Sequence, residues 1–515
     1  MRATGPGRPV FLGAAVAMLV VLLVRNRYLF TSRIYEDGDA ALNSLLVQRA
    51  ERLQLLIGNY SRVGFHHPGP AFLYLLAAGQ AVFHDLLHVV PSPYGGQVLG
   101  DLFFAAALVG WIVLIVYRVT GSGLAAGASF ATVLWFAGAH SLAGDLWFPY
   151  LYSAVFLLLV VSGAALAAGR TAELPAFVLA AGFLVHGHVS FVLFVAVTAA
   201  VAGAGWWLAH RRGHRGGDRR GELGAHRRQV RISLVLVGLF LLAPALQTAL
   251  HFPGPWPDYL HYAGRRDGGG WHPLGAGLRY LAWYWSGGQV PLVVTVLAAV
   301  GGAVLLVSDR DPARRRFFRA LFGMLAVESG LFLIYLLGGV DELVPKNRYV
   351  GFFYLGVPLL LALAGAAQLG ARARDLGRLA PVAVSAAAAV VAGIGVAGPA
   401  WTSPYRGVPG YPAAVAALAS SPDRAAGPIT VSIPRHDDWA LAAGLVLEAT
   451  RRHLPICVQG AEWTNLFTGR YVCPARHAGW PVQVRSTLSS AGGGPVPAGS
   501  RVVWSGPSMV VVTRP

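Results

Sequence analysis

The chain has 515 residues, of which 55% are hydrophobic and only 12% are charged. This composition excludes an ordinary water-soluble domain and an intrinsically disordered chain. A formal net charge of +18 would suit a nucleic-acid-binding protein, but the arginine clusters lie in short loops between apolar runs. Positive charge in such loops sets the orientation of membrane helices. We therefore exclude nucleic acid as a partner.

Apolar runs recur along most of the chain, and each is long enough to cross about 30 Å of hydrocarbon as a helix. We predict an all-α polytopic membrane bundle of about eleven transmembrane helices. They begin near residues 9, 97, 123, 150, 174, 190, 232, 289, 320, 349 and 379. Arginine-rich segments at 210–231, 309–319 and 371–378 are expected in the cytoplasm, which places the N-terminus inside and the C-terminal region outside.

Acidic residues crowd together directly after the first apolar run. The sequence YEDGDAAL contains Glu36, Asp37 and Asp39, although the whole chain has only 23 Asp and Glu. Asp39 would serve as an N-cap of the next helix, but three acids exceed what a cap needs. Because like charges repel, at least one carboxyl should have a raised pKa and act as a general base. Asp37 and Asp39 are the catalytic candidates, and Glu36 is a substrate-binding candidate.

A histidine pair precedes a Pro-Gly-Pro turn in NYSRVGFHHPGPAFLY, residues 59–74. The turn predicts entry into an apolar helix at the membrane interface, and it would equally form a rigid pocket wall. In the second case Arg62, His66 and His67 would face an anionic or sugar ligand. The following segment, residues 70–90, is apolar, but a crossing there would move the 210–231 cluster outside. We expect an amphipathic or re-entrant helix on the outer face.

Three further sites carry isolated charges. Asp145 stands between two apolar runs and would steer an acceptor or, with Asp37 and Asp39, hold a divalent cation such as Mg or Mn. Arg265 lies in an aromatic-rich loop and is a phosphate-binding candidate. Lys346 is the only lysine of the chain, and with Arg348 it suggests a phosphate clamp or a basic flank at a helix end.

The C-terminal region, residues 400–515, differs in character from the rest. β-branched runs alternate with a helical segment that has an acidic start and a basic end, which predicts a small α/β domain outside the membrane. We expect the division into domains at residue 400, with an outer loop at 26–96. The only two cysteines, Cys457 and Cys473, lie in this region and form either a disulfide or two buried free thiols.

Together these motifs resemble the GT-C superfamily of integral-membrane glycosyltransferases, in the branch of protein O-mannosyltransferases and aminoarabinose transferases. YEDGDAAL stands where the family has its acidic motif, and HHPGPAFLY where it has a His-Pro-Pro turn. Asp145 matches the family's second acid, and NRYVGFFYLGVP matches its late Arg-Tyr. The acidic motif reads Glu-Asp-Gly-Asp, so either Asp37 or Asp39 takes the catalytic place.

The resemblance implies inverting transfer of a hexose or pentose from a polyprenyl-phosphate donor. The acceptor would be an extracytoplasmic glycan, lipid or protein of the cell envelope, and the enzyme a multi-pass protein of the plasma membrane. No cofactor is certain, and a divalent cation stays open. The alternative is a transporter or flippase of lipid-linked sugars. Transporters usually contain internal repeats, and neither the acidic nor the proline motif occurs twice.

Overall fold

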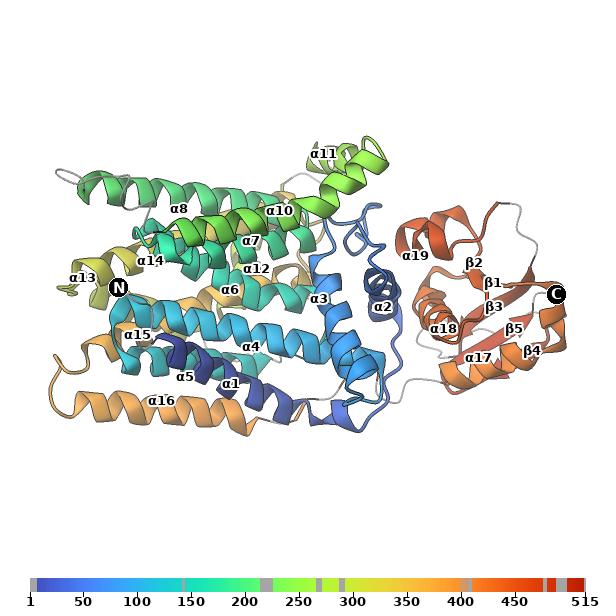
Figure 1. Ribbon diagram of the computed structural model, residues 1–515, viewed down its shortest axis with the longest axis horizontal. Coiled ribbons are helices and arrows are strands. Elements are labelled where there is room, and N and C mark those ends of the chain that lie inside the picture. Colours follow the sequence, from blue (N-terminus) through green and yellow to red (C-terminus); the bar gives the residue numbers. More distant parts are fainter. Residues whose placement is uncertain are drawn as a thin grey trace. The chain divides into compact units, whose positions relative to one another are not determined.

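The computed structural model describes all residues except 1–6, 141–143, 214–225, 265–270, 287–291, 399, 402, 404, 406–409, 476–478, 488–497 and 514–515. The chain divides into two compact units (Figure 1). Unit 1 consists of Met1–Arg27 and Asp101–Trp401, and unit 2 consists of Tyr28–Gly100 and Thr402–Pro515.

Unit 1 is built from helices, because each apolar run must satisfy its own backbone hydrogen bonds in lipid. Its helices are α1 (Gly7–Arg25), most of α4 (Pro93–Thr120), α5 (Gly123–His140), α6 (Phe148–Ala167), α7 (Leu174–Gly187), α8 (Phe191–Gly213), α10 (Arg227–Leu250), α11 (Trp256–Gly264), α12 (Leu274–Ser286), α13 (Leu292–Val307), α14 (Pro312–Gly338), α15 (Gly356–Arg372) and α16 (Ala380–Ala397), with short 3₁₀ helices η3 (Thr171–Glu173) and η4 (Pro345–Leu355).

Eight helices among the described residues are long and apolar enough to cross a membrane: α1, α4, α6, α8, α10, α14, the pair η4–α15, and α16. They confirm a polytopic membrane fold. The other three expected spans correspond to the apolar helices α5, α7 and α13, which are not among the eight. The count of about eleven therefore stays a prediction. The segment at 70–90 forms α3 (Ala71–Gln80) and a π-helical turn, η2 (Ala81–Leu86), and is also not among the eight.

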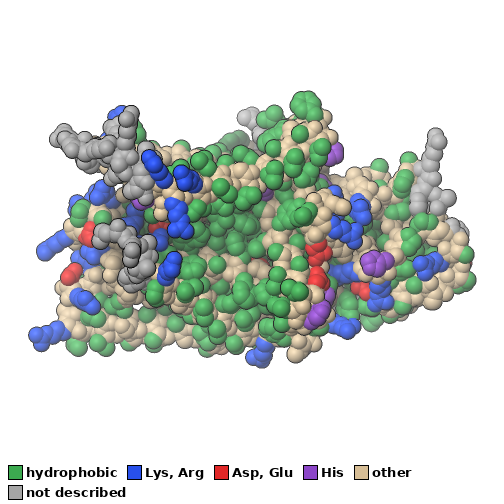
Figure 2. Space-filling view, in the orientation of Figure 1, with side chains coloured by type: hydrophobic (Ala, Val, Ile, Leu, Met, Phe, Trp, Pro, Cys, Tyr) green, Lys and Arg blue, Asp and Glu red, His purple; other side chains and the backbone are tan. Residues whose placement is uncertain are grey.

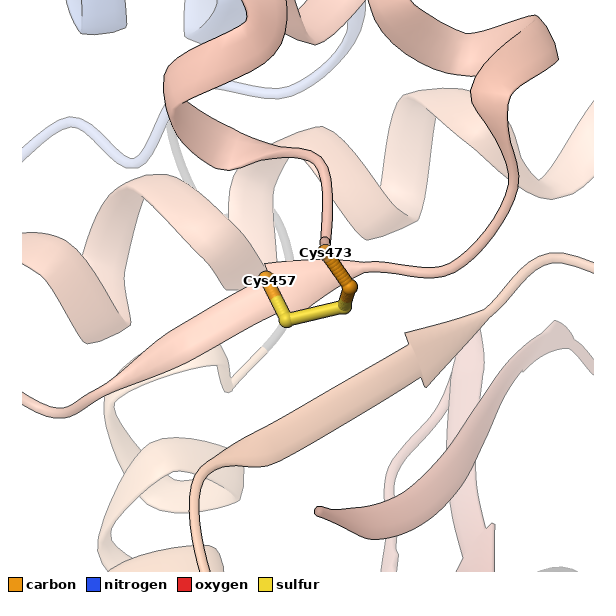
Figure 3. Close-up of a disulfide and its surroundings, with 2 residues drawn as sticks. All are labelled: Cys457 and Cys473. Carbon is orange, nitrogen blue, oxygen red and sulfur yellow. A yellow bond between two sulfur atoms is a disulfide. The ribbon is translucent and has the colours of Figure 1, made fainter. Parts of the chain in front are cut away.

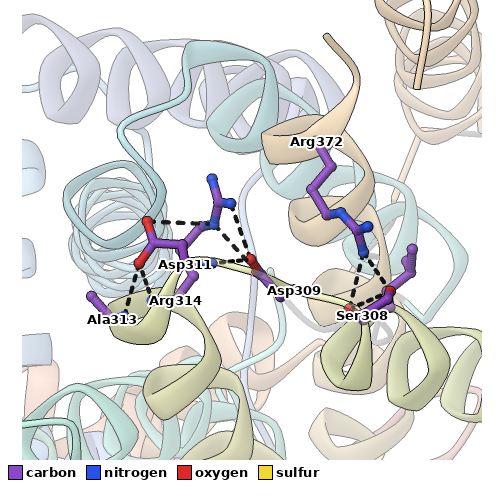
Figure 4. Close-up of polar contacts among 7 residues, drawn as sticks. Ser308, Asp309, Asp311, Ala313, Arg314 and Arg372 are labelled. Atoms are coloured by element: carbon purple, nitrogen blue, oxygen red, sulfur yellow. Dashed lines mark hydrogen bonds and ion pairs between the residues drawn. The ribbon is translucent and has the colours of Figure 1, made fainter. Parts of the chain in front are cut away.

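Polar side chains fix the ends of the helices of unit 1. Arg25, at the end of α1, donates from Nη1 to the Gly395 carbonyl of α16 at 2.7 Å and lies over the Trp401 ring at 4.5 Å. The connection between α13 and α14 is held by Arg314, which binds Asp309 at 3.0 Å, while Asp311 caps α14 (Figure 4). Basic side chains gather at the end of the bundle that carries this connection (Figure 2).

Unit 2 combines the outer loop with the C-terminal region. The loop contributes the 3₁₀ helix η1 (Arg27–Phe30, which begins at the unit boundary), α2 (Gly38–Glu51), α3 and η2. The C-terminal region contributes α17 (Tyr411–Ser420), α18 (Trp439–Arg451), α19 (Thr464–Tyr471), the short helices η5 (Pro422–Ala426), η6 (His436–Asp438) and η7 (Ala461–Trp463), and strands β1 (Ile429–Ser432), β2 (Ile456–Val458), β3 (Trp480–Ser486), β4 (Val502–Ser505) and β5 (Met509–Thr513).

The five strands form one sheet in the order β2-β1-β3-β5-β4. β1 pairs in parallel with β2 and β3, while β5 pairs antiparallel with β3 and β4. Cys457 of β2 and Cys473 are joined by a disulfide that closes the segment containing α19 (Figure 3). The structure thus has the α/β organisation expected for this region.

The hydrophobic core of unit 2 crosses the expected domain boundary. Ala41, Leu42 and Leu45 of α2 are buried in the same cluster as Val446 of α18 and Val482 of β3. The division at residue 400 therefore does not describe the packing, because the outer loop shares its core with the C-terminal region. Hydrophobic contacts, not chain continuity, set the unit boundary.

Candidate active site

The acidic segment is held in place by the start of α2. Gly38, the first residue of the helix, has φ +48°, and an added Cβ would lie 3.5 Å from Ala440. A side chain at position 38 would therefore be strained by the backbone conformation, although its Cβ would meet only an ordinary contact. Asp37, not Asp39, is the N-cap residue, and its side chain makes no capping hydrogen bond. Helix capping therefore does not account for the carboxylate of Asp37.

Glu36 has a different environment from its neighbour. Its side chain is fully buried, and Arg451 of α18 donates to both carboxylate oxygens, at 2.8 and 2.6 Å. The hydroxyl of Ser44 donates to Oε1 at 2.8 Å. This carboxylate is bound by Arg451 and Ser44, and the substrate-binding role expected for Glu36 stays a prediction. Glu36 instead links the outer loop to the C-terminal region.

Asp37 is half-buried and forms no ion pair with any described residue. Burial raises the pKa of its carboxyl to about 6, and the neighbouring Glu36 adds to the rise, while a hydrogen bond from its own backbone opposes it. The buried Tyr411 of α17 also lies close to it, and Asp37 contributes to the raised pKa of that phenol. A carboxyl with such a pKa changes charge close to neutral pH, as a general base should.

Asp39 is the second residue of α2 and accepts a hydrogen bond from the Tyr60 hydroxyl. Tyr60 is paired with His66 through an isolated β-bridge. The contact therefore ties the first turn of α2 to the histidine motif. Of the two acids that the sequence left as alternatives, Asp39 accepts a hydrogen bond from Tyr60, and Asp37 forms no ion pair with a described residue. Which of them is catalytic stays a prediction.

The histidine motif forms a tight turn in unit 2. Gly58 packs so closely against this turn that an added Cβ would lie 2.8 Å from the carbonyl oxygens of His67 and Gly69. His66 Nδ1 lies 3.2 Å from the Gly58 carbonyl, and burial lowers the pKa of His66 to about 4. His66 is thus neutral at physiological pH and can hydrogen-bond a sugar but not attract phosphate. His67 is buried, whereas Arg62 is exposed.

Asp145 belongs to unit 1, in the connection that leads into α6. Its Oδ1 accepts from the Trp147 amide at 2.9 Å, and burial raises the pKa of its carboxyl. Asp101 of α4 is buried close enough to interact electrostatically with it. The ring of Trp147 packs on that of Tyr349 at 5.0 Å, so the connection that carries Asp145 lies against η4.

Helix η4 carries the predicted phosphate clamp, and its two basic residues differ. The Arg348 guanidinium lies over the Trp283 ring at 4.3 Å, while the Tyr284 hydroxyl donates to the Arg348 carbonyl at 2.6 Å. Lys346 has a side chain that is 76% exposed and pairs at 3.5 Å with Glu342. Arg348 is therefore held in one place, and Lys346 is not. Arg265 lies outside the described residues.

The structure thus brings the predicted residues together in two groups. Unit 2 holds Glu36, Asp37, Asp39 and the histidine turn, and unit 1 holds Asp145 beside the segment of Arg348. Within the described part of the chain, no group of three or more His, Cys, Asp or Glu is placed to hold a metal ion. We therefore assign no step to a metal, and Asp37, Asp39 and Asp145 stay candidates only.

Sequence reasoning missed several residues of these groups. Arg451, Tyr60 and Tyr411 surround the acids, and Trp283 supports Arg348. Arg451 lies 415 residues from Glu36, at the end of a helix and next to Arg452. No local pattern singles it out. Asp101 does carry a local signal, because it is an isolated acid in an otherwise apolar helix.

No model of a known protein family matches the sequence, and no curated protein does. Among solved structures, the chain is similar to ArnT from Cupriavidus metallidurans bound to undecaprenyl phosphate, with 16% identity and a TM-score of 0.54. The similarity covers 99% of this chain and 98% of ArnT. An oligosaccharyltransferase from Archaeoglobus fulgidus is more distant, with 11% identity, a TM-score of 0.39, and coverage of 85% of this chain and 64% of the other. The protein is a multi-pass membrane protein with the GT-C fold of ArnT.

Proposed function

We propose that the protein is a membrane glycosyltransferase that moves a hexose or pentose from a polyprenyl-phosphate donor to an extracytoplasmic acceptor, with inversion at the anomeric carbon. The observation that carries this proposal is Asp37, a half-buried carboxyl without an ion pair among the described residues and with a pKa of about 6. The fold supports it, because the ArnT structure with the same fold contains undecaprenyl phosphate.

In the proposed reaction, the Asp37 carboxylate accepts the proton of an acceptor hydroxyl, whose oxygen attacks the anomeric carbon of the donor. A bond forms between that oxygen and the carbon as the bond from the carbon to the phosphate oxygen breaks. The polyprenyl phosphate leaves with the electron pair as a stable anion, so no strong general acid is needed. As a separate proposal for unit 1, Arg348 would bind a phosphate group through its planar guanidinium.

The other residues would have supporting roles. Arg451 keeps Glu36 in place, and Tyr60 fixes Asp39, so that Asp37 keeps its position at the start of α2. Within unit 2, His66 and Arg62 would contact the sugar or acceptor. As a separate proposal for unit 1, Asp145 would contact a substrate beside η4. We propose that the arginine-rich end of the bundle is cytoplasmic and that unit 2 is extracytoplasmic.

The test is a transfer assay with the purified full-length protein and a panel of polyprenyl-phosphate sugars. The proposal is supported if the unaltered protein gives a product of inverted configuration and if Asp37→Asn gives no transfer. Movement of intact lipid-linked sugar across a vesicle membrane, without release of polyprenyl phosphate, would contradict it and establish a flippase.

A further inference from the structure

Three consecutive aromatic residues lie near the end of α12, namely Trp283, Tyr284 and Trp285. Tryptophan and tyrosine are common in belts at the membrane–water interface, where one end of each ring is wet. This triplet has a different environment, because Tyr284 is fully buried and the two tryptophans are half-buried. The triplet is therefore packed within unit 1.

Each side chain of the triplet contacts η4. The guanidinium carbon of Arg348 lies over the Trp283 ring, 4.3 Å from its centroid. The Tyr284 hydroxyl donates to the Arg348 carbonyl at 2.6 Å. The Trp285 indole Nε1 donates to the Tyr354 hydroxyl at 2.9 Å. The triplet thus holds both the side chain and the backbone of Arg348.

A glycine allows η4 to approach α12 this closely. Gly351 interrupts the 3₁₀ helix with φ −119° and ψ 17°, and an added Cβ would collide with the rings of Phe332 and Tyr284. The Tyr354 ring stacks on that of Phe332, with 4.4 Å between the centroids. Because Phe332 belongs to α14, two helices fix the segment that carries Arg348.

The guanidinium of Arg348 is held by stacking. Its Nε is buried and has no hydrogen-bond partner among the described residues. A buried N–H without an acceptor is unfavourable, so this arrangement calls for an explanation other than stability. Because Nε is inaccessible, an anion can reach the guanidinium only through its two Nη atoms. The Trp283 ring beneath the group restricts the directions in which these atoms point.

We infer that Trp283 is a positioning residue for a phosphate group that Arg348 binds. The inference rests on the lipid-phosphate substrate of the proposed function, and it concerns unit 1 alone. Trp283 acts through Arg348 and does not touch the phosphate. It keeps the Nη atoms in place before the ligand arrives, so less side-chain freedom is lost on binding. Tyr284 and Trp285 hold the backbone of η4 in the same way.

The experiment measures the binding of farnesyl phosphate, a short polyprenyl phosphate, and of the neutral farnesol. The full-length protein is placed in nanodiscs, with empty nanodiscs as the blank. Trp283→Leu should raise the Kd for farnesyl phosphate about tenfold, and Trp283→Phe, which keeps an aromatic face, about threefold. The Kd for farnesol should not change in either variant, because farnesol has no phosphate.

The matched control is Trp207→Leu, which removes a ring that lies 3.4 Å from the Arg211 guanidinium at the end of α8. The same kind of stack is lost elsewhere in unit 1, so the Kd should stay unchanged. In an Arg348→Met background, Trp283→Leu should have no further effect, because residues that act through one another are not additive. Where transfer is observed, Trp283→Leu should raise KM for the donor and leave kcat within about threefold.

Thermal unfolding shows whether each variant is folded. A lower melting temperature of Trp283→Leu with an unchanged Kd would mean a merely structural role and would overturn the inference. An equal rise of the Kd in Trp207→Leu, or an additive effect in the Arg348→Met background, would also overturn it, as would farnesyl phosphate binding no better than to the blank. Trp283-dependent binding of farnesyl phosphate without any sugar transfer would overturn the proposed transferase and support this inference.

Discussion

The acidic segment of unit 2, residues 36–39, and the basic segment of unit 1, residues 346–348, each contain neighbouring residues of like charge that have different environments. In the acidic segment, Glu36 is fully occupied by Arg451, and Asp37 beside it is left without an ion pair among the described residues. In the basic segment, Arg348 is stacked on Trp283, while Lys346 stands in solvent with Glu342. Neighbouring residues of like charge thus have unlike environments. Charge in the sequence locates a site, but burial and partners decide which residue can act.

The largest effect is expected for the unpaired acid. Asp37→Asn should lower turnover by roughly 10²–10⁴-fold, because the amide cannot accept the proton of the acceptor hydroxyl. Asp39→Asn should lower it much less, since Asp39 is already bonded to Tyr60. The measurement is single-turnover transfer from a polyprenyl-phosphate sugar. If Asp39→Asn is the more damaging variant, the catalytic assignment must move to Asp39.

The same Asp37→Asn variant should be more stable than the unaltered protein at pH 7. The folded pKa of about 6 lies above the ordinary value of 3.8, so the folded state disfavours the ionised form. The stability that the neutral carboxyl provides is lost as the pH rises through about 6. The substitution by asparagine removes this loss of stability because an amide does not ionise. Thermal unfolding of both proteins at pH 7 and pH 4.5 checks this, and a lower melting temperature of the variant at pH 7 would contradict it.

The paired acid should show the opposite behaviour, with a large effect on stability. Arg451→Met leaves the buried Glu36 carboxylate without its partner, which should cost about 3–5 kcal/mol. The matched control is Arg452→Met, because Arg452 forms only an exposed pair with Glu448 and should contribute less than about 1 kcal/mol. Glu36→Gln/Arg451→Met should recover part of the loss. Equal free energies of unfolding for Arg451→Met and Arg452→Met would mean that the ion pair between Glu36 and Arg451 does not stabilise the protein.

The pH dependence of activity should follow the Asp37 carboxyl. The carboxylate is the active form, so turnover should rise with pH through about 6. At pH 5 it should be about tenfold below its plateau, since one carboxyl in ten is then ionised. Asp39→Asn should keep the same midpoint. A profile that is flat between pH 5 and pH 8, with the protein folded throughout, would exclude Asp37 as the base.

The smallest effects are expected in the basic segment, and they test the contrast between its two residues. Arg348→Lys keeps the charge but loses the planar fork and the stacking on Trp283, so KM for the donor should rise by about tenfold. Lys346→Met should change KM by less than about threefold, because exposed ion pairs contribute little. Steady-state kinetics with varied donor separates KM from kcat. A larger rise in KM for Lys346→Met than for Arg348→Lys would show that Lys346 is the more important of the two residues for donor binding.

Local patterns predicted the fold class and the residues to inspect. Long apolar runs can only be helices in lipid, and the acidic cluster and the His-Pro turn were visible because they interrupt those runs. The burial and the partners of individual side chains could not be predicted in this way. Glu36 and Asp37 are adjacent in the sequence, yet only one lies against Arg451, more than four hundred residues away. Such pairing depends on contacts that no local window contains.

The sequence by itself determined that the chain is a helical membrane protein with an α/β C-terminal region, because hydropathy and periodicity are local properties of the chain. It also determined where charge is concentrated. Only the tertiary structure decided that α2 shares its core with α18 and the sheet, that Arg451 takes up Glu36, and that Asp37 stays without an ion pair in the described part of the chain. The physical reason is that burial and ion pairing depend on neighbours in space, and the fold chooses those neighbours from distant parts of the chain.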